Sequence, residues 1–165
     1  MRIVCLIKLN KDNDKIHEVQ HKLMKLGYKN LVRYTTRERA EGEVNAVDFH
    51  FITRDKFIRL VEKDIIMDWM EYQGEIYGIP HPIGAKNNVV IVELKEYYKI
   101  KNIYGEQVVG VCILPDLNKL NKIELGVKLK NIEDAVTDVE IKIDEGLDSD
   151  IILSKILKYV LESRY

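Results

Sequence analysis

Apolar residues follow two patterns that alternate along the chain. Three continuous runs rich in β-branched residues, Arg2–Leu9, Asn88–Leu94 and Val108–Leu114, predict buried strands of a parallel sheet. Apolar residues at helical spacing predict helices that cover such a sheet. These segments are Lys15–Leu26 after an N-cap at Asp14, the short and mixed stretch Glu96–Tyr104, Asp116–Leu129, and a closing helix capped by Ser149 or Asp150.

The elements become shorter in the middle of the chain. Asn30–Tyr34 and Val44–Phe51 predict two strands, and a short helix capped by Thr53 or Asp55 follows them. Ile65–Tyr72 and Glu75–Ile79 predict a hairpin around Gly74. After the loop 81–88 the pattern returns to long buried strands, and Val136–Ile143 adds an alternating one. The whole predicts an α/β fold with a three-layer core, residues 1–32 and 81–165, into which a small α+β lobe, residues 33–80, is inserted.

Composition limits the kinds of partner. The 165 residues fit one domain, and 26 basic against 27 acidic residues give a net charge of −1. This balance predicts no general attraction to nucleic acid or to anionic membranes, so any anion site must be local. Cys5 and Cys112 lie inside apolar runs and are typical of reduced core cysteines in a cytoplasmic protein; a buried disulfide between neighbouring strands is the alternative.

The stretch from Tyr34 to Pro80 carries the candidate chemistry. It begins Y-T-T-R-E-R-A-E-G-E-V, which places Arg37 and Arg39 within a few residues of Glu43, and it supplies Tyr77 further on. Guanidinium groups and a tyrosine hydroxyl are donors suited to an anionic ligand. The sequence therefore predicts an anion pocket within the inserted lobe.

The loop after the first strand lacks the features of a phosphate cradle. Its sequence, K-L-N-K-D-N-D-K from Lys8 to Lys15, has no glycine and no Lys-Ser or Lys-Thr pair, and it carries two aspartates. A solvated loop is the favoured interpretation, and contact of its lysines with an anion is the alternative. His17 and His21, four residues apart, could face a metal together, but no third ligand is evident nearby, so we predict no metal site.

Three blocks of the lobe resemble the guanylate kinase family. They are T-T-R-x-x-x-x-G-E-V at Thr35–Val44, D-F-H-F-I-T at Asp48–Thr53, and D-W-x-E-Y-x-G-x-x-Y-G at Asp68–Gly78. They agree in order and spacing over about 45 residues, whereas the rest of the chain agrees only in the pattern of its elements. The resemblance implies a P-loop-kinase-like fold whose inserted lobe binds GMP or dGMP.

The resemblance also implies roles for individual residues. Arg37 matches a phosphate-binding arginine, and Tyr77 matches a tyrosine whose hydroxyl meets the phosphate. Asp68 matches the carboxylate that reads the guanine edge. Residues expected at the phosphate are Arg37, Arg39, Tyr77 and Arg33; those expected at the base and pocket wall are Glu43, Asp68, Thr36 and Glu93.

Several positions depart from the family pattern. The second arginine falls at Ala40, which leaves Arg39 one place earlier as its substitute. A phosphate-binding tyrosine is replaced by Phe49, and a hydroxyl residue is replaced by Arg33, an extra cation. Lys95 stands where the family has an aspartate, in a lysine-rich stretch that ends at Lys101. The arginine-rich lid is also reduced, because residues 118–131 contain lysines but no arginine.

These features favour a protein that binds a guanine nucleotide, or a related phosphate-bearing ligand, without conventional kinase catalysis. Phosphoryl transfer depends on positioning and charge neutralisation, and a single lid arginine can be worth about a thousandfold in rate. We therefore predict no catalytic residue and no cofactor. The alternatives are a module that binds phosphorylated peptides or a protein partner, and a GMP kinase whose ATP site is unorthodox or completed by a partner, which would need ATP and Mg²⁺.

Overall fold

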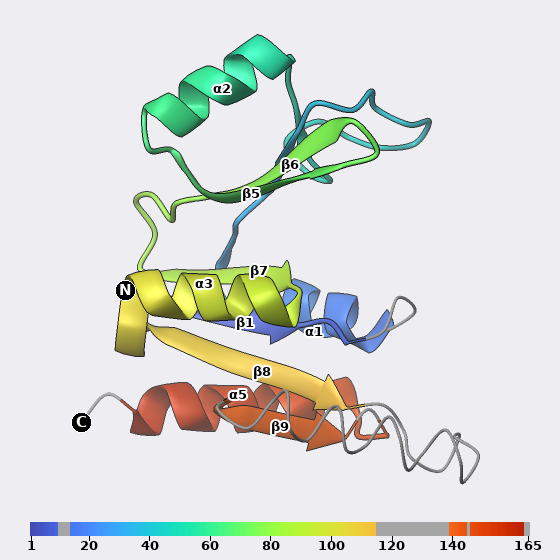
Figure 1. The fold of residues 1–165 in the computed structure, drawn as a ribbon. Helices are drawn as coiled ribbons and strands as arrows, with labels where there is room; N and C mark the ends of the chain where they lie inside the picture. Colours follow the sequence, from blue (N-terminus) through green and yellow to red (C-terminus); the bar gives the residue numbers. More distant parts are fainter. Residues whose placement is uncertain (10–13, 115–138, 145, 164–165) are drawn as a thin grey trace, which may run out of the picture.

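Two sheets lie one above the other in the computed structural model, which describes residues 1–9, 14–114, 139–144 and 146–163 (Figure 1). The larger sheet has the strand order β2-β7-β1-β8-β9, and all of its strand pairs are parallel. Its strands are β1 (Arg2–Ile7), β2 (Lys29–Asn30), β7 (Asn87–Val92), β8 (Val108–Leu114) and β9 (Ile141–Asp144).

Helices cover both faces of the larger sheet. α1 (Asp14–Lys25) and α5 (Ser149–Glu162) bury Ile16, Val19, Ile152 and other apolar residues against one face. α3 (Leu94–Tyr104), followed by a 3₁₀ turn (Gly105–Gln107), buries Tyr97 and Ile100 against the other. Continuous apolar strands are therefore explained by burial on both faces. This arrangement confirms the predicted α/β fold with a three-layer core.

The smaller sheet has the order β4-β3-β6-β5 and lies entirely within residues 34–80. Its strands are β3 (Tyr34–Thr35), β4 (His50–Phe51), β5 (Ile66–Tyr72) and β6 (Glu75–Pro80), and β5 and β6 form the predicted hairpin. α2 (Arg54–Glu62) covers its outer face (Figure 1), where Phe57, Ile66 and Ile76 form a small buried cluster. Because each sheet has its own buried cluster, we treat the smaller sheet with α2 as the lobe.

A glycine permits the close packing of α2 on the lobe sheet. A Cβ atom built on Gly78 would lie 2.6 Å from Cζ of Phe57 and 2.9 Å from Cγ2 of Ile66. Such contacts are too short for carbon atoms, so a larger residue would push α2 away from β6. Gly78 in the third sequence block is thus explained by packing.

The structure corrects four details of the predicted elements. The stretch Val44–Phe51 was expected to be a strand, but only His50–Phe51 pairs in the sheet, because a turn follows Val44 and Ala46 adopts a φ of 66°. Asn30–Tyr34 is not one strand either, since Asn30 pairs with β7 and Tyr34 with β6.

The remaining two corrections concern helix starts. Asp14 is already the first residue of α1, and Asp148, not Ser149 or Asp150, caps α5 by accepting a hydrogen bond from the amide of Asp150. Thr53 caps α2 as predicted. The helix expected at 116–129 and the start of the strand expected at 136–143 lie outside the described residues.

Both cysteines are free and buried, which confirms the prediction of reduced core thiols. Burial raises the pKa of Cys112 to about 12, so its thiol stays protonated.

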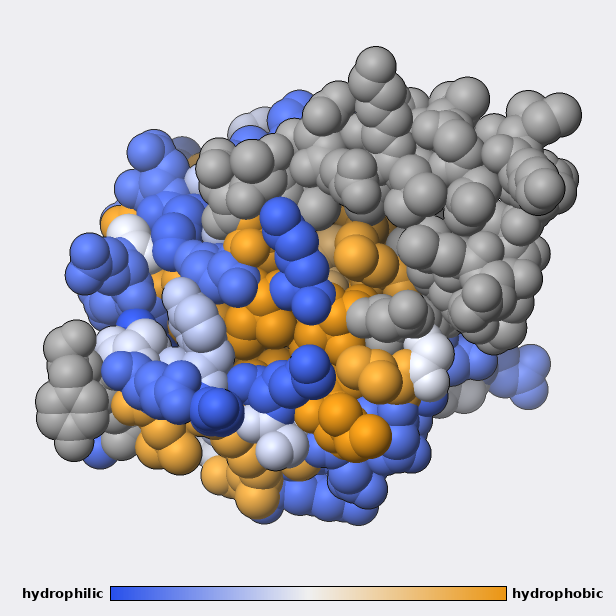
Figure 2. Space-filling model, turned by 90° about the horizontal axis from the view of Figure 1, so that it is seen from below, coloured by the Kyte–Doolittle hydropathy of each residue, from blue (hydrophilic) through white to orange (hydrophobic). Residues whose placement is uncertain are grey.

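Among the described residues, no helix combines the length and apolar character needed to cross a membrane. Seen from below, apolar and hydrophilic side chains lie side by side on the face that includes α5 (Figure 2), where Leu153, Leu157 and Leu161 line a shallow hollow.

Candidate functional site

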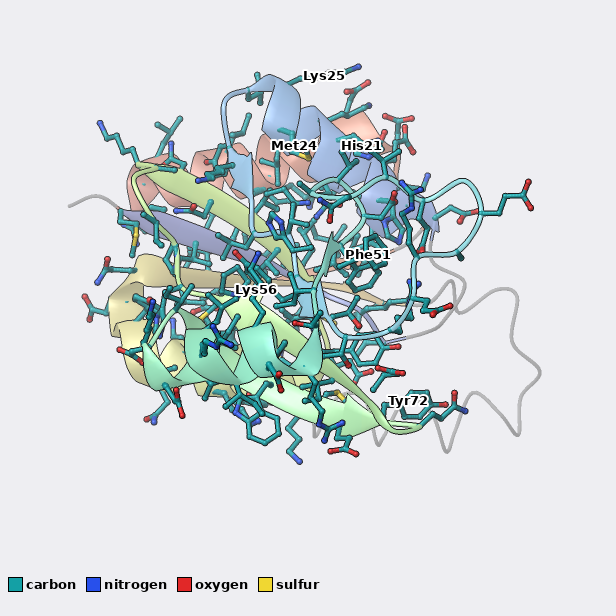
Figure 3. The ribbon with its side chains drawn as sticks, turned by 90° about the horizontal axis from the view of Figure 1, so that it is seen from above. His21, Met24, Lys25, Phe51, Lys56 and Tyr72 are labelled. Atoms are coloured by element: carbon teal, nitrogen blue, oxygen red, sulfur yellow. The ribbon has the colours of Figure 1, made fainter. Side chains whose placement is uncertain are left out.

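A cavity of about 490 Å³ lies between the larger sheet and the lobe. The ends of β1 and β7 contribute Lys8, Val92 and Glu93, which lie at the carboxyl edge of the parallel strands. This is the edge at which α/β sheets bind ligands. One face of α1 also lines the cavity and includes His21 and Met24, whereas Tyr72 lies at the distant tip of the β5–β6 hairpin (Figure 3). The lobe contributes Glu43, Val47, Asp48 and Phe49.

Arg37 is held in place by Glu43 in a two-pronged ion pair. Its Nη1 and Nη2 atoms donate to the two carboxylate oxygens of Glu43 at 2.7 and 2.5 Å, and Nη1 also donates to the Glu38 carbonyl at 2.9 Å. The Ala40 amide donates to the same carboxylate at 2.8 Å. Hydrogen bonds from Arg37 and the Ala40 amide lower the pKa of Glu43 to about 2, and the bond to Glu43 raises the pKa of Arg37. The guanidinium is therefore fixed and charged.

Aromatic rings complete the surroundings of Arg37. Its Cζ atom lies 5.0 Å from the ring centroid of Phe49 and 5.3 Å from that of Phe51, within the range of cation–π attraction. The Phe49 ring in turn packs edge-on against the Tyr77 ring, with the two ring centroids 6.1 Å apart. The Tyr77 hydroxyl also contributes to the raised pKa of Arg37, after Glu43. Arg37 and Tyr77, which the sequence predicted to share a ligand phosphate, thus lie together.

Most N–H groups of the Arg37 guanidinium already have partners within the lobe. An arginine side chain has five N–H groups, and three of those of Arg37 are used by Glu38 and Glu43. Tyr77 contributes a further hydrogen bond to the same guanidinium. Arg39, the second predicted phosphate ligand, is exposed, and its charge makes a minor contribution to the lowered pKa of Glu43.

Thr36 has a hydroxyl that is already engaged within the lobe. It donates to Glu75 at 2.5 Å and accepts from the Ile76 amide at 2.9 Å, so it joins the start of the 36–49 loop to β6. In this arrangement Thr36 positions the loop that carries Arg37.

Arg33 and Glu93 lie at the start of α3. The two Nη atoms of Arg33 donate to both carboxylate oxygens of Glu96 at 2.6 and 2.8 Å, and one also donates to the Ile91 carbonyl. Burial alone would raise the pKa of Glu96. The hydrogen bonds and charge of Arg33 outweigh this effect, so the pKa of Glu96 lies below its usual value. The Glu93 amide donates to the same carboxylate at 2.7 Å, and Glu93 is the N-cap of α3. The Arg33–Glu96 ion pair therefore links the start of the lobe segment to α3.

Asp68 lies on β5 and is paired with Lys99 of α3. The Lys99 ammonium donates to Oδ1 of Asp68 at 2.5 Å. Only 12% of the Asp68 side chain is exposed, against 45% of Lys99. Among the described residues, the two ion pairs between the lobe segment and α3 are Arg33–Glu96 and Asp68–Lys99.

Sequence reasoning did not identify Glu96 and Lys99 as partners of site residues. Glu96 stands three residues after Glu93, the spacing of a capping box, and this signal could have marked the start of the helix. Lys99 lies within the lysine-rich stretch of α3, but only the packing of α3 against β5 brings it to Asp68.

Metal ligands do not gather in the part of the chain that the structure describes, where no group of three His, Cys, Asp or Glu side chains could hold an ion. His17 and His21 both lie on the exposed cavity-facing side of α1. Burial, followed by the nearby charges of Lys8 and His21, lowers the pKa of His17.

Known proteins match both the sequence and the fold. A family model described as guanylate kinase matches residues 11–108, more than half of the chain. The guanylate kinase of Bacillus subtilis is 30% identical over 95 residues, which are 54% of this chain and 47% of that protein. The guanylate kinase of Ehrlichia canis is 34% identical over 106 residues, 61% of this chain and 48% of that protein. The chain thus spans about half the length of the curated relatives it matches.

A solved structure extends the likeness in fold to the whole chain. The crystal structure of guanylate kinase from Anaplasma phagocytophilum superposes with a TM-score of 0.66 and covers 100% of this chain and 87% of that one. The sequence identity in this comparison is 19%, so the similarity concerns the fold alone.

Proposed function

Because the chain belongs to the guanylate kinase family, we propose that it binds a guanine-type nucleoside monophosphate in its lobe without conventional phosphoryl transfer. The observation that carries this proposal is the fixed, charged guanidinium of Arg37, which Glu43 orients and which the Tyr77 hydroxyl adjoins. A phosphate dianion is well matched by such donors. GMP, dGMP or a related phosphate-bearing ligand would place its phosphate there.

In this proposal, Asp68 contacts the base of the nucleotide, whereas Arg37 and Tyr77 contact its phosphate. It faces the same side of the lobe sheet as Tyr77, because Asp68 lies opposite Ile79 and Met70 lies opposite Tyr77 in the β5–β6 register. Directly opposite residues share a face, and alternate residues along each strand return to it. A single ligand could therefore reach from the phosphate donors to the carboxylate.

The proposed loss of catalysis rests on the sequence of the loop after β1. A triphosphate cradle uses glycine amides, a lysine and a hydroxyl that holds Mg²⁺. Residues 8–15 supply no glycine and no hydroxyl, and two of them are aspartates that would repel phosphate. These residues do not fit ATP with Mg²⁺.

Two measurements on the same preparation test the proposal. Calorimetry with GMP and dGMP should show saturable binding with one site per chain. A coupled assay of ADP release, with ATP, Mg²⁺ and GMP present, should give the rate of the protein-free blank. No binding at millimolar nucleotide would end the proposal of binding, and GMP-dependent ADP release would instead establish a kinase with an unorthodox ATP site.

A phosphopeptide is the second candidate ligand of the same guanidinium, because an arginine also recognises phosphoserine. The observation that favours it is Tyr72 of β5, which is 55% exposed and lies on the same face of the lobe sheet as Asp68. Aromatic residues of this kind anchor protein partners. A phosphoserine peptide that binds tightly and is not displaced by GMP would favour this candidate.

A further inference from the structure

A group of basic side chains lines the cavity between the larger sheet and the lobe. Lys8 directly follows β1, and His17 and His21 lie one turn apart on α1; all three belong to the cavity lining. Lys25, near the end of the same helix, is outside the lining and points away from the lobe (Figure 3). The proposed function, which places a phosphate at Arg37, uses none of the three lining groups.

The charges of these groups act on one another. Burial and then the charges of Lys8 and His21 lower the pKa of His17. The charge of Asp14 has the opposite effect and is the smallest of these influences. Within the described ranges, no ion pair joins any of the three basic groups to a carboxylate. Positive groups that repel one another are stabilised when an anion binds among them.

The carboxylates that line the same cavity are already engaged. Glu43 holds the Arg37 guanidinium. Asp48 accepts a hydrogen bond from the Val44 amide at 2.7 Å, and Glu93 is the N-cap of α3. Among the described residues, the ammonium and the two imidazoles are thus the basic groups of the lining that form no ion pair with an acidic side chain.

This set of donors suits a tetrahedral oxyanion. An ammonium supplies N–H donors and each imidazolium supplies two more, whereas phosphate and sulfate carry acceptor oxygens on every side. Both imidazoles are exposed, so such an ion can reach them from solvent. The set has no glycine amides and no hydroxyl for Mg²⁺, so it differs from the cradle of a triphosphate.

We propose that Lys8, His17 and His21 form a second anion subsite, which binds a tetrahedral oxyanion more tightly when the two histidines are protonated. The ion is either inorganic phosphate or the phosphoryl group of a larger ligand. This subsite goes beyond the proposed function, because it is separate from Arg37 and lies on the opposite wall of the cavity, on α1 and at the end of β1.

The proposal carries a definite pH dependence. A charged imidazole attracts an anion more strongly than a neutral one, so the affinity should rise as the pH falls from about 8 to about 6. Ammonium and carboxyl groups ordinarily titrate outside this range. Those that face the histidines from the packed elements are Lys8, Asp14, Glu43, Asp48 and Glu93.

Proton NMR of the whole chain, titrated with sulfate at about pH 6 and at about pH 8, tests this proposal. Sulfate keeps its two charges over this range, so a change in affinity reports on the protein. The chain has four histidines, and His50 and His81 lie outside the cavity lining, which makes them internal references. We expect saturable shifts of the His17 and His21 imidazole resonances, higher affinity at the lower pH, and no shift of the two references.

Substitution of Lys8 then locates the bound ion. Lys8→Met should weaken sulfate binding about tenfold, the loss expected for one hydrogen bond between charged groups. Lys25→Met removes the same charge from α1 outside the cavity lining and is the matched control. Its sulfate affinity should equal that of the unaltered protein.

Three results would overturn the proposal and leave the proposed function untouched. Shifts of all four histidines together, or shifts that never saturate, would show a general effect of salt. Equal affinities at the two pH values would exclude the histidines. Equal losses in Lys8→Met and Lys25→Met would exclude Lys8.

Addition of GMP to the sulfate-bound protein separates the two sources of the ion. Simultaneous binding of both would show that the subsite takes a free oxyanion beside the lobe ligand. Competition that disappears in Lys8→Met would show that the subsite takes the phosphoryl group of the nucleotide. Both results support the subsite, whereas failure of GMP to bind would count against the proposed function alone.

Discussion

The lobe sheet and the larger sheet differ in how their edges are equipped to hold an anion. In the lobe, the Glu43 carboxylate orients Arg37 through hydrogen bonds of 2.7 and 2.5 Å, and the Tyr77 hydroxyl adjoins Arg37. At the carboxyl edge of the larger sheet, the loop after β1 contains lysines and aspartates but no glycine. Among the described residues, the lobe combines a fixed cation, Arg37, with the hydroxyl of Tyr77.

Under the proposed function, the lobe would therefore keep a monophosphate site while the loop after β1 provides no cradle for a triphosphate. The larger sheet has an extensive apolar core on both faces, whereas the lobe is stabilised by a small cluster around Phe57. The Phe57 cluster is distinct from the clusters of the larger sheet, and the lobe joins one of these through Ile79 of β6, so a change confined to the Phe57 cluster should act mainly on the lobe. The stability and ligand binding of the lobe can therefore be measured within the intact chain.

The largest expected effect comes from removing the centre of the lobe core. Phe57 is 1% exposed and packs between α2 and β6. Phe57→Ala should destabilise the lobe by about 3–5 kcal/mol, because it loses burial and leaves a cavity. Amide hydrogen exchange should then rise in α2, β5 and β6 and stay low in β1 and β7. Ile58→Ala, an exposed neighbour in α2, serves as the control. Equal loss of protection in both sheets would contradict a distinct Phe57 cluster.

The next effect concerns the phosphate donor. Arg37→Met keeps an apolar stem against Phe49 and Phe51 but removes the cation. Loss of charge-assisted hydrogen bonds should weaken nucleotide binding about 100-fold, as calorimetry would measure. Arg54→Met is the matched control, because Arg54 forms an exposed pair with Glu71 in the same lobe. Similar affinities for the two variants would show that Arg37 does not hold the ligand.

A smaller effect compares one glycine from each sheet. A Cβ on Gly78 would meet Phe57 at 2.6 Å, and a Cβ on Gly110 would meet Tyr97 at 2.6 Å. Each change to alanine should cost about 1–3 kcal/mol through overpacking. Gly78→Ala should raise amide exchange in the lobe, and Gly110→Ala in the larger sheet. A reversal of this pattern, or no change in either variant, would refute the packing assigned to these glycines.

The smallest effect is a pH dependence from Glu43. Its pKa is lowered to about 2 in the folded protein, first by the hydrogen bond from Arg37 and then by that from Ala40. A carboxyl with a lowered folded pKa contributes stability that is present above its unfolded pKa of about 4.3 and is lost as the pH falls through the folded value. The difference in unfolding free energy between the unaltered protein and Glu43→Gln should therefore shrink from pH 4.5 to pH 2. A constant difference over that range would contradict the ion pair.

Much of the fold could be predicted from the pattern of the sequence. Buried strands such as Val108–Leu114 are continuous apolar runs, and Thr53 marks the start of α2 by its capping chemistry. The segment 44–49 misled the prediction, because its alternation of apolar and polar residues resembles a strand although its backbone turns at Ala46. Local pattern does not reveal a positive φ at a residue other than glycine.

The candidate site was predicted less completely than the fold. Arg37, Glu43 and Tyr77 could be grouped because two of them are close in sequence and the third belongs to the same hairpin lobe. The partners of Arg33 and Asp68 lie 63 and 31 residues away on α3. Such pairs depend on how α3 packs against the lobe, and no short-range sequence signal encodes that packing.

The central claim is that the lobe binds a nucleoside monophosphate through Arg37 and does not transfer phosphate to it. Its most direct test is a calorimetric titration with GMP and dGMP, made beside an ADP-release assay on the same sample. We expect saturable binding with one site per chain, its loss in Arg37→Met, and an ADP rate equal to the protein-free blank. Absence of binding at millimolar nucleotide, or ADP release that depends on the monophosphate, would contradict it.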